Sequence, residues 1–383
     1  MMLRWPGMPA LVGMSLLGFT SFFLTLSALP VYAVDRGVPE ALAGLVTTVM
    51  LMATVTAQLV VPAAVEKIGQ RATLIIGLLA LGAPTPLLLL SDQLWWLLVV
   101  SAIRGVGFAV LTVLTPLVAT QIAPPGSHGR AIGLYGLAVA VPNVVAVPAA
   151  VALTNAGHFP IVAVLAAIPL LAIPLAGRFP EPAPRTDRRS ARSPLPTRKL
   201  AGILALLLAL TLSGGGIFAI LPVQLADSAA VTLALLVLGV TSALARWRAG
   251  ALADRAGPAR LLPACAAIGV VGLILLALGV SRTGLASGVL VVLGTAVFGI
   301  AYGGAQNLTL LLSFDLAGSD RRAGASAAWN ATYDAGTAIG ALLIGAIAAG
   351  SSLSAAMLGC AALVVVTAVT AVSGARRAKP PPP

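Results

Sequence analysis

Long apolar segments separated by short polar loops dominate the sequence. Each segment is long enough to cross a hydrocarbon core of about 30 Å. Only a helix satisfies its backbone hydrogen bonds within one such segment, so each is predicted to be a transmembrane helix. The twelve segments are residues 8–33, 41–63, 72–91, 95–121, 130–154, 159–177, 200–224, 229–247, 261–281, 285–313, 324–349 and 352–373.

The first segment superficially resembles a signal peptide, because Arg4 precedes an apolar run that starts at Met8. The run continues to Ala33, which is too long for the apolar region of such a peptide, and eleven similar segments follow. We therefore expect this segment to be retained as the first transmembrane helix.

Composition supports a membrane protein. Hydrophobic residues make up 59% of the chain and charged residues 9%, and the mean hydropathy is +1.04. A soluble protein has about 25% charged residues, so this chain cannot form a water-exposed surface. Cys265 and Cys360 lie singly in apolar stretches without a CxxC pair, and His128 and His158 lie in loops. These residues predict neither a metal site nor a cofactor.

The net charge of +12 could indicate nucleic-acid binding, but its distribution does not. With the N-terminus in the cytoplasm, 20 of the 23 Lys and Arg residues fall in cytoplasmic loops and tails. Only Arg36 and Arg282 fall outside, and Arg104 falls within a helix. This bias predicts a multi-pass inner or plasma membrane protein with both termini in the cytoplasm. The basic groups would face lipid headgroups of the bilayer rather than nucleic acid.

One long hydrophilic connector, rich in Pro and Arg, occupies residues 178–199. Such a stretch cannot bury a core and is predicted to be a flexible linker. It divides the chain into an N-terminal bundle at 1–177 and a C-terminal bundle at 200–373, with a cytoplasmic tail at 374–383.

An internal repeat supports this division. Residues 28–31 (ALPV) end the first segment and residues 220–223 (ILPV) end the seventh, an offset of 192 that also aligns Arg130 with Arg322. The predicted fold is therefore all-α, with twelve transmembrane helices in two pseudo-symmetric six-helix bundles. Duplicated transporters have this plan, with the substrate site between the halves near the bilayer midplane.

The most specific motif is the sequence GALADRAG at residues 250–257, after the eighth segment. It resembles the G-x-x-x-D-R-x-G loop motif of the major facilitator superfamily. A weaker copy with Glu66, Lys67 and Gly69 follows the second segment, and Arg246 matches the family's usual residue one turn before the loop. The resemblance covers essentially the whole chain.

The resemblance implies a gating role for these loops. An acidic residue at the end of one half would lie against the positive N-terminus of a helix in the other half when the cytoplasmic side is closed. Asp254 would thus face the start of the fifth segment, and Glu66 the start of the eleventh. The alternative is that the charges set topology and the glycines form tight turns. The gating residues implied are Glu66, Lys67, Gly69, Arg246, Gly250, Asp254, Arg255 and Gly257.

Two charges lie deep within apolar segments. Arg104 is about ten residues into the fourth segment, near an R-x-x-x-G stretch of the family, and Asp334 is about ten residues into the eleventh. Buried charges in membranes commonly mark solute or ion pathways, so both are candidates for coupling and Asp334 for carrying a proton. The alternatives are an arginine that extends to the outer headgroups and an acid that packs helices.

The family's architecture implies a solute cavity lined by the first, fourth, seventh and tenth helices. The polar or aromatic candidates are Thr20, Ser21, Phe22, Thr25, Thr112, Thr115, Thr211, Ser213, Phe218, Tyr302, Gln306 and Asn307, with Asn330 on the face of Asp334. So sparse a polar set suits a lipophilic or amphipathic solute. Alternatively, these side chains join neighbouring helices by hydrogen bonds.

These observations predict a secondary active transporter that works by alternating access, most simply a proton-coupled exporter of a small lipophilic or amphipathic molecule. The sequence lacks an ATP-binding P-loop, so a gradient must supply the energy. Proton-coupled uptake is the nearest alternative. An intramembrane lipid-modifying enzyme would need clustered acids or nucleophiles at membrane depth, which are missing, so the chain is not expected to be an enzyme. We expect it to act as a monomer whose partners are the solute, protons and the bilayer.

Overall fold

The computed structural model describes residues 2–180, 197–224 and 229–376, and the regular structure of these residues is entirely helical. Twelve of the described helices are long and apolar enough to cross a membrane, which confirms the predicted number of spans. Most of the predicted linker at 178–199 and of the tail at 374–383 lies outside the described residues.

The chain forms two compact units. Unit 1 comprises Met1–Pro124, Leu137–Arg188 and Ser326–Ala331, and unit 2 comprises Pro125–Gly136, Arg189–Ala325 and Thr332–Pro383. Two helices, which carry residues 125–136 and 326–331 respectively, therefore contribute to both units.

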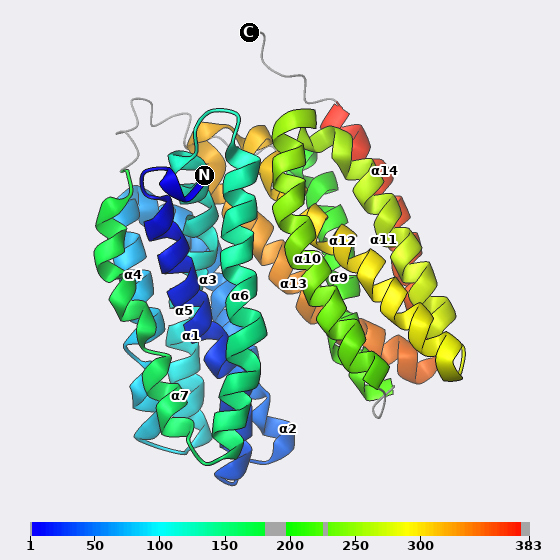
Figure 1. Cartoon of the computed structure of the whole chain (residues 1–383). Coiled ribbons are helices and arrows are strands. Elements are labelled where there is room, and N and C mark those ends of the chain that lie inside the picture. The colour runs from blue at the N-terminus through cyan, green and yellow to red at the C-terminus, as the bar shows by residue number, and fades with distance from the viewer. Residues whose placement is uncertain (1, 181–196, 225–228, 377–383) are drawn as a thin grey trace. The chain divides into compact units, whose positions relative to one another are not determined.

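The helices up to residue 178 are labelled in Figure 1, apart from the short 3-10 segments. They are η1 (Met2–Arg4), α1 (Met8–Asp35), α2 (Glu40–Ala43), α3 (Leu45–Ile68), α4 (Gln70–Gly82), η2 (Thr85–Leu89), α5 (Leu94–Ile122), α6 (His128–Asn155), α7 (Phe159–Leu165) and η3 (Ile168–Arg178). The later helices are α9 (Thr197–Gln224), α10 (Ala229–Ala256), α11 (Pro258–Val280), α12 (Gly284–Ala317), η4 (Ser319–Arg321), α13 (Arg322–Gly350) and α14 (Leu353–Arg376).

The third and sixth predicted helices are interrupted. The segment expected at 72–91 forms α4 and then the 3-10 turn η2, and the segment expected at 159–177 forms α7 and then η3. Proline is the cause, because Pro84 and Pro169 have no N–H to donate to the carbonyl four residues earlier. The tighter 3-10 winding continues the chain beyond each break.

Helix α10 is longer than predicted, since it runs to Ala256 instead of residue 247. Its last turns are rich in Ala, Leu and Arg, which favour helix, and the helix ends at Gly257, whose φ is 82°. Arg246 and Arg248, which the sequence placed in a cytoplasmic loop, therefore lie within the helix. Arg246 is ten residues before the end, about 15 Å along the axis.

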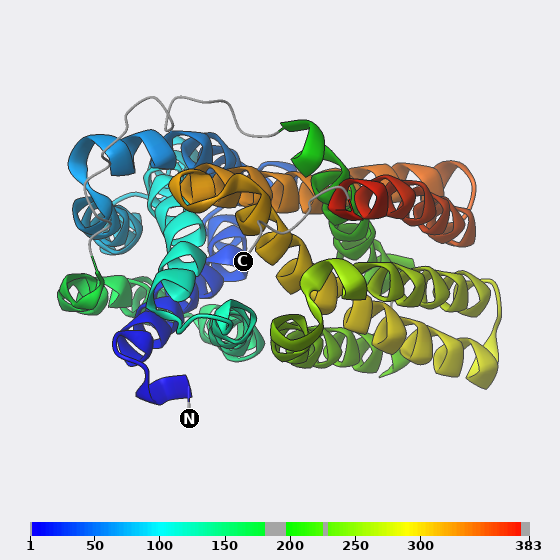
Figure 2. The ribbon, with the colours of Figure 1, turned by 90° about the horizontal axis from the view of Figure 1, so that it is seen from above.

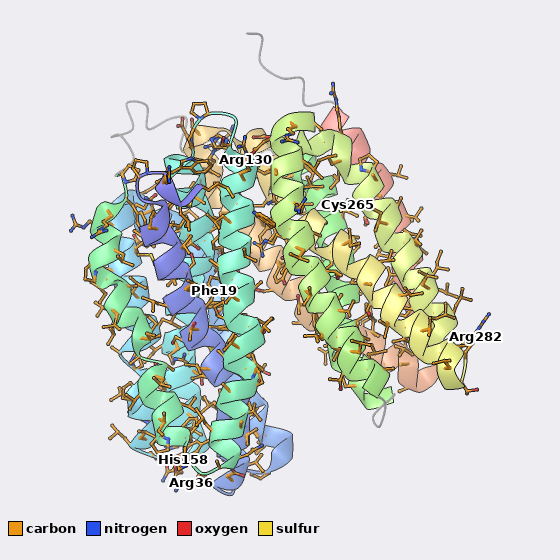
Figure 3. The ribbon with its side chains drawn as sticks, in the orientation of Figure 1. Phe19, Arg36, Arg130, His158, Cys265 and Arg282 are labelled. Atoms are coloured by element: carbon orange, nitrogen blue, oxygen red, sulfur yellow. The ribbon has the colours of Figure 1, made fainter. Side chains whose placement is uncertain are left out.

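One end of unit 1 is held by aromatic and charged contacts. The Tyr32 ring on α1 stacks on Phe159 at the start of α7, with centroids 3.8 Å apart. The Tyr32 hydroxyl donates to Asp92, and Arg36 lies 3.4 Å from the same carboxylate. Figure 3 shows Arg36 and His158 at this end of the unit. The contacts join α1 to the loop before α5 and to α7.

Glycines set the spacing of helices in unit 2. Helix α12 packs against both α10 and α11 (Figures 1 and 2). A Cβ at Gly272 on α11 would lie 2.4 Å from the backbone nitrogen of Phe298, and one at Gly294 on α12 would lie 2.7 Å from the backbone nitrogen of Leu276. Because both contacts involve backbone, no larger side chain fits, and the helices approach closely.

Candidate functional site

The start of α6 is capped by a carboxylate from α10. Asp254 Oδ1 accepts a hydrogen bond from the Gly129 N–H at 2.7 Å, and Oδ2 accepts from the Arg130 N–H at 3.0 Å. The Arg130 guanidinium adds an ion pair at 3.1 Å. The first N–H groups of a helix have no partner within the helix and carry partial positive charge, so a carboxylate stabilises them. The Asp254 side chain is only 5% exposed, whereas that of Arg130 is 45% exposed.

Three glycines on one face of α6 allow this contact. A Cβ on Gly129 would collide with the Gly250 carbonyl, and one on Gly133 would lie 2.8 Å from the Trp247 carbonyl. A Cβ on Gly136 would meet the Arg246 side chain. The 129, 133, 136 spacing places all three on one helical face. Sequence analysis did not identify them, although the G-x-x-x-G-x-x-G pattern was a usable indication.

A cluster of polar side chains adjoins the capped end of α6 in unit 2. Asn307 on α12 is fully buried and donates to the carbonyls of Arg246 (3.0 Å) and Gly129 (3.3 Å). The Arg246 guanidinium donates to Gln306 Oε1 at 2.9 Å and lies over the Tyr135 ring, 5.5 Å from its centroid. Arg246 Nε and Asn307 Oδ1 are buried without a hydrogen-bond partner. The cluster thus joins α6, α10 and α12 and retains unused donors and acceptors.

Tyrosines of α12 and α13 continue this polar region. The hydroxyls of Tyr302 and Tyr333 share a hydrogen bond of 2.8 Å, and Tyr302 lies one turn from Gln306 on α12. Gly214 on α9 faces the Tyr302 ring, where a Cβ would lie 2.6 Å from Cε2. Asp334, the predicted proton carrier, follows Tyr333 on α13 and is half-buried.

Arg104 lies in different surroundings, inside unit 1. Its side chain is 0% exposed. Nε donates to the Leu81 carbonyl at 3.2 Å, Nη1 donates to Thr25 Oγ1, and Nη2 donates to the carbonyl (3.1 Å) and hydroxyl (3.2 Å) of Ser21. Each acceptor is neutral and belongs to α1 or α4. The guanidinium therefore fastens α5 to two neighbouring helices.

The hydroxyls beside Arg104 join the two interrupted helices. Ser21 Oγ donates to the Ala166 carbonyl, which lies at the break after α7. Thr85, at the break after α4, donates to the same carbonyl at 3.4 Å and to the Leu81 carbonyl at 3.2 Å. The backbone carbonyls of Leu81 and Ala166, next to the two helix breaks, thus accept hydrogen bonds from side chains inside the unit.

Asn330, a predicted cavity residue, bonds to backbone in unit 1. Its amide donates to the Thr112 carbonyl on α5 at 3.0 Å, and Ser326 Oγ donates to the Val113 carbonyl at 2.7 Å. The Thr112 carbonyl would otherwise bond the N–H of residue 116, which is proline. Asn330 therefore supplies the donor that Pro116 lacks.

The other predicted cavity residues form local contacts. The hydroxyls of Thr25, Thr112, Thr115, Thr211 and Ser213 each donate to a carbonyl three or four residues earlier on their own helix. Phe22 is buried and stacks on Phe108 with centroids 3.8 Å apart, Thr20 is half-buried, and Phe218 is 42% exposed. The structure thus brings Tyr302, Gln306 and Asn307 together with Arg246, whereas most of the threonine and serine hydroxyls bond to their own helices.

The two predicted loops have similar backbones. Gly69 separates α3 from α4 with a φ of 86°, and Gly257 separates α10 from α11 with a φ of 82°. Only glycine adopts such angles readily, so both loops can turn within one residue. Glu66, Lys67 and Arg255 are exposed. Among the described residues, no three His, Cys, Asp or Glu side chains gather as metal ligands.

Comparison with known proteins places this geometry in a family. The profile of the Major Facilitator Superfamily matches residues 11–334. No curated protein sequence matches the chain. Among solved structures, the Escherichia coli fucose:proton symporter FucP is 18% identical, with a TM-score of 0.75 and 98% of each chain covered.

Two further structures share the fold. The human organic anion transporter MFSD10 (TETRAN) is 15% identical, with a TM-score of 0.74, and the alignment covers 95% of this chain and 98% of that one. The proton:xylose symporter XylE is 14% identical, with a TM-score of 0.72 and coverage of 96% and 94%. Identities this low establish the fold alone. With a family profile that matches most of its length, this twelve-span chain belongs to the Major Facilitator Superfamily of secondary transporters and is not an enzyme.

Proposed function

We propose that this transporter exports a small lipophilic or amphipathic solute by alternating access, driven by protons. The observation that carries the proposal is the contact of Asp254 with the start of α6. This contact consists of hydrogen bonds between a carboxylate and backbone N–H groups. When it opens, water can solvate both partners, so the bond can break and re-form at a modest cost in free energy.

The contact would act as a cytoplasmic latch. Closure places the nearly buried Asp254 carboxylate against the positive end of α6, and opening returns both to water. Both termini and the loop after α10 would lie on the cytoplasmic side, as the distribution of Lys and Arg predicts. Alternating access requires such an equilibrium between states of similar free energy.

Asp334 is the proposed proton carrier. It is half-buried on α13, beside the hydrogen-bonded pair of Tyr333 and Tyr302. A carboxyl group within a membrane-spanning segment can gain and lose a proton as its surroundings change from apolar to wet. Proton and solute movement are coupled if the protonated form and the solute-bound form can each change conformation, whereas the form that carries neither cannot.

Transport by proteoliposomes tests this proposal. The purified chain is reconstituted with pyranine inside the vesicles, a pH gradient is imposed, and uptake of neutral, cationic and anionic dyes is followed. We expect proton flux opposite to dye flux in the wild type. The Asp334→Asn variant is expected to bind dye but to lose gradient-driven accumulation, whereas Asp320→Asn, at an exposed position in η4, should behave like the wild type.

Each result has a defined meaning. Normal accumulation by Asp334→Asn would exclude Asp334 as the proton carrier. Proton and dye fluxes in the same direction would replace export with uptake symport. Dye movement that does not respond to the pH gradient would rule out proton coupling.

A further inference from the structure

The two arginines that lie deep within helices have opposite surroundings. Arg104 is fully buried, and its described hydrogen bonds satisfy four of the five N–H groups that a guanidinium carries. Arg246 is half-buried, and its described hydrogen bonds use one N–H group, which donates to Gln306. The described hydrogen bonds thus use most of the donors of Arg104 but only one donor of Arg246.

No carboxylate is among the described partners of Arg246. They are a carboxamide oxygen and the face of the Tyr135 ring. An arginine within a membrane-spanning helix is costly unless it faces water or pairs with an acceptor, and a neutral amide compensates only part of its charge. The positive charge of Arg246 is therefore available to bind an anionic ligand.

A second unused group lies on α12, in the same unit. Asn307 is fully buried, and its Nδ2 donates to the carbonyl of Arg246 itself, which fixes the orientation of the amide. Its Oδ1 has no partner, and neither does Arg246 Nε. Gly136 leaves room for the arginine, because a Cβ there would lie 2.5 Å from Nε. Unit 2 thus holds an unused charged donor on α10 and an unused acceptor on α12, the helix that Arg246 contacts through Gln306.

We propose that Arg246 binds the carboxylate of an amphipathic organic acid, which is the solute of the transport function proposed above. The planar guanidinium suits a carboxylate because two parallel N–H groups can donate to its two oxygens. Asn307 Oδ1 would accept from a hydroxyl or amide N–H of the same molecule. Tyr302, one turn from Gln306 on α12, would contact its apolar part.

Matched pairs of acids and amides test this site in the full chain. The probes are benzoate against benzamide and 2-naphthoate against 2-naphthamide, which have nearly equal shape and differ in charge. Thermal unfolding and calorimetry of the detergent-purified protein measure binding. We expect both acids to raise the melting temperature and the amides to leave it unchanged. Arg246→Gln is expected to weaken acid binding about 10- to 100-fold, as loss of a charged hydrogen bond predicts.

Two further variants control for charge and folding. Arg248→Gln removes an exposed arginine two residues away on α10, and it should bind the acids like the wild type. Arg246→Lys keeps the charge without the planar fork, so it should fold and bind the acids with intermediate affinity. If Arg246→Gln does not fold, the lysine variant provides the comparison.

Three results would overturn the proposal: equal stabilisation by acids and amides, wild-type acid affinity in both Arg246 variants, or no response of the wild type to either acid. Each would leave Arg246 as a hydrated arginine only. Failure of this binding proposal can be distinguished from failure of the transport proposal. If protons drive neutral dyes but no acid binds, the binding proposal fails and the transport proposal stands. If acids bind through Arg246 but no gradient-driven movement occurs, the transport proposal fails and the binding proposal stands.

Discussion

Arg104 is a charge buried deep within unit 1, and its described acceptors are all neutral. Its donors reach the Leu81 carbonyl, at the interrupted end of α4, and the Ser21 carbonyl on α1. Neither partner is charged and the side chain is inaccessible, so direct contact with solute or solvent would require the unit to open. We therefore propose that Arg104 stabilises unit 1, in place of the coupling role expected from the sequence.

Replacing Arg104 is expected to reduce stability before it affects transport chemistry. Arg104→Met keeps the bulk but leaves several buried oxygens without their donor, so we expect a loss of about 2–4 kcal/mol in unfolding free energy. Thermal melting of the purified protein measures it. Ser101→Ala, one turn away, is the control, because Ser101 Oγ is buried without a partner and its loss should be nearly neutral. A stable Arg104→Met protein with no transport would instead restore a role in coupling.

Single residues were the hardest scale to predict from sequence. Hydropathy shows that Arg104 lies inside a helix, but the partners come from α1 and α4, far away in the chain. The apolar run ends near residue 247, which predicts Arg246 at the end of its helix, although the helix continues to Ala256. Which face an arginine occupies depends on the tertiary structure.

At the scale of elements, the bond between Asn330 and α5 compensates for a proline within a helix. Pro116 cannot donate to the Thr112 carbonyl, and α5 nevertheless continues to Ile122. The Asn330 amide, 3.0 Å away, takes the place of the missing N–H. Helix-breaking residues persist in membrane helices where a neighbouring side chain satisfies the freed backbone in this way.

A double-mutant cycle tests this compensation. Asn330→Ala leaves the Thr112 carbonyl with no donor and should cost about 1–3 kcal/mol of stability, measured by thermal or denaturant unfolding. In a Pro116→Ala background, the helix can supply its own N–H, so the same change should cost less than half as much. Equal costs in both backgrounds would show that Asn330 acts independently of the proline.

The twelve spans could be predicted because a membrane requires long apolar helices, and their number follows from hydropathy alone. The interruptions after Gly82 and Leu165 could not be predicted, because the neighbours of a proline decide whether it kinks, breaks or leaves intact a membrane helix. The glycine face of α6 was missed for a similar reason. The three glycines matter because α10 packs against them, and the sequence of α6 alone does not identify the helix that packs there.

At the scale of the whole molecule, α6 and α13 each belong to both compact units. The first residues of α6 pack with unit 2, and residues 326–331 of α13 pack with unit 1. Within unit 2, the start of α6 donates charged hydrogen bonds to Asp254; within unit 1, Ser326 and Asn330 donate neutral hydrogen bonds to carbonyls of α5.

The latch proposal makes a prediction about Asp254 that separates its backbone bonds from its ion pair. Asp254→Asn removes the negative charge from the start of α6, whereas Arg130→Gln removes only the exposed partner and leaves the backbone bonds in place. Surface ion pairs contribute at most about 1 kcal/mol, and charged hydrogen bonds contribute about 1.5–3 kcal/mol. The two variants are therefore expected to differ by about 2- to 100-fold in how often the latch opens.

Labelling of a cysteine at the latch measures that difference. Ser127, next to α6, is 8% exposed, so Ser127→Cys should react slowly with a membrane-impermeant maleimide while the latch is closed, and Cys265 and Cys360 are buried. We expect Asp254→Asn to accelerate labelling about tenfold and Arg130→Gln to change it little. Equal effects would assign the stability of the latch to the surface ion pair. If neither variant changed the rate, α6 would stay in place without Asp254, and the glycine contacts with α10 would have to account for closure.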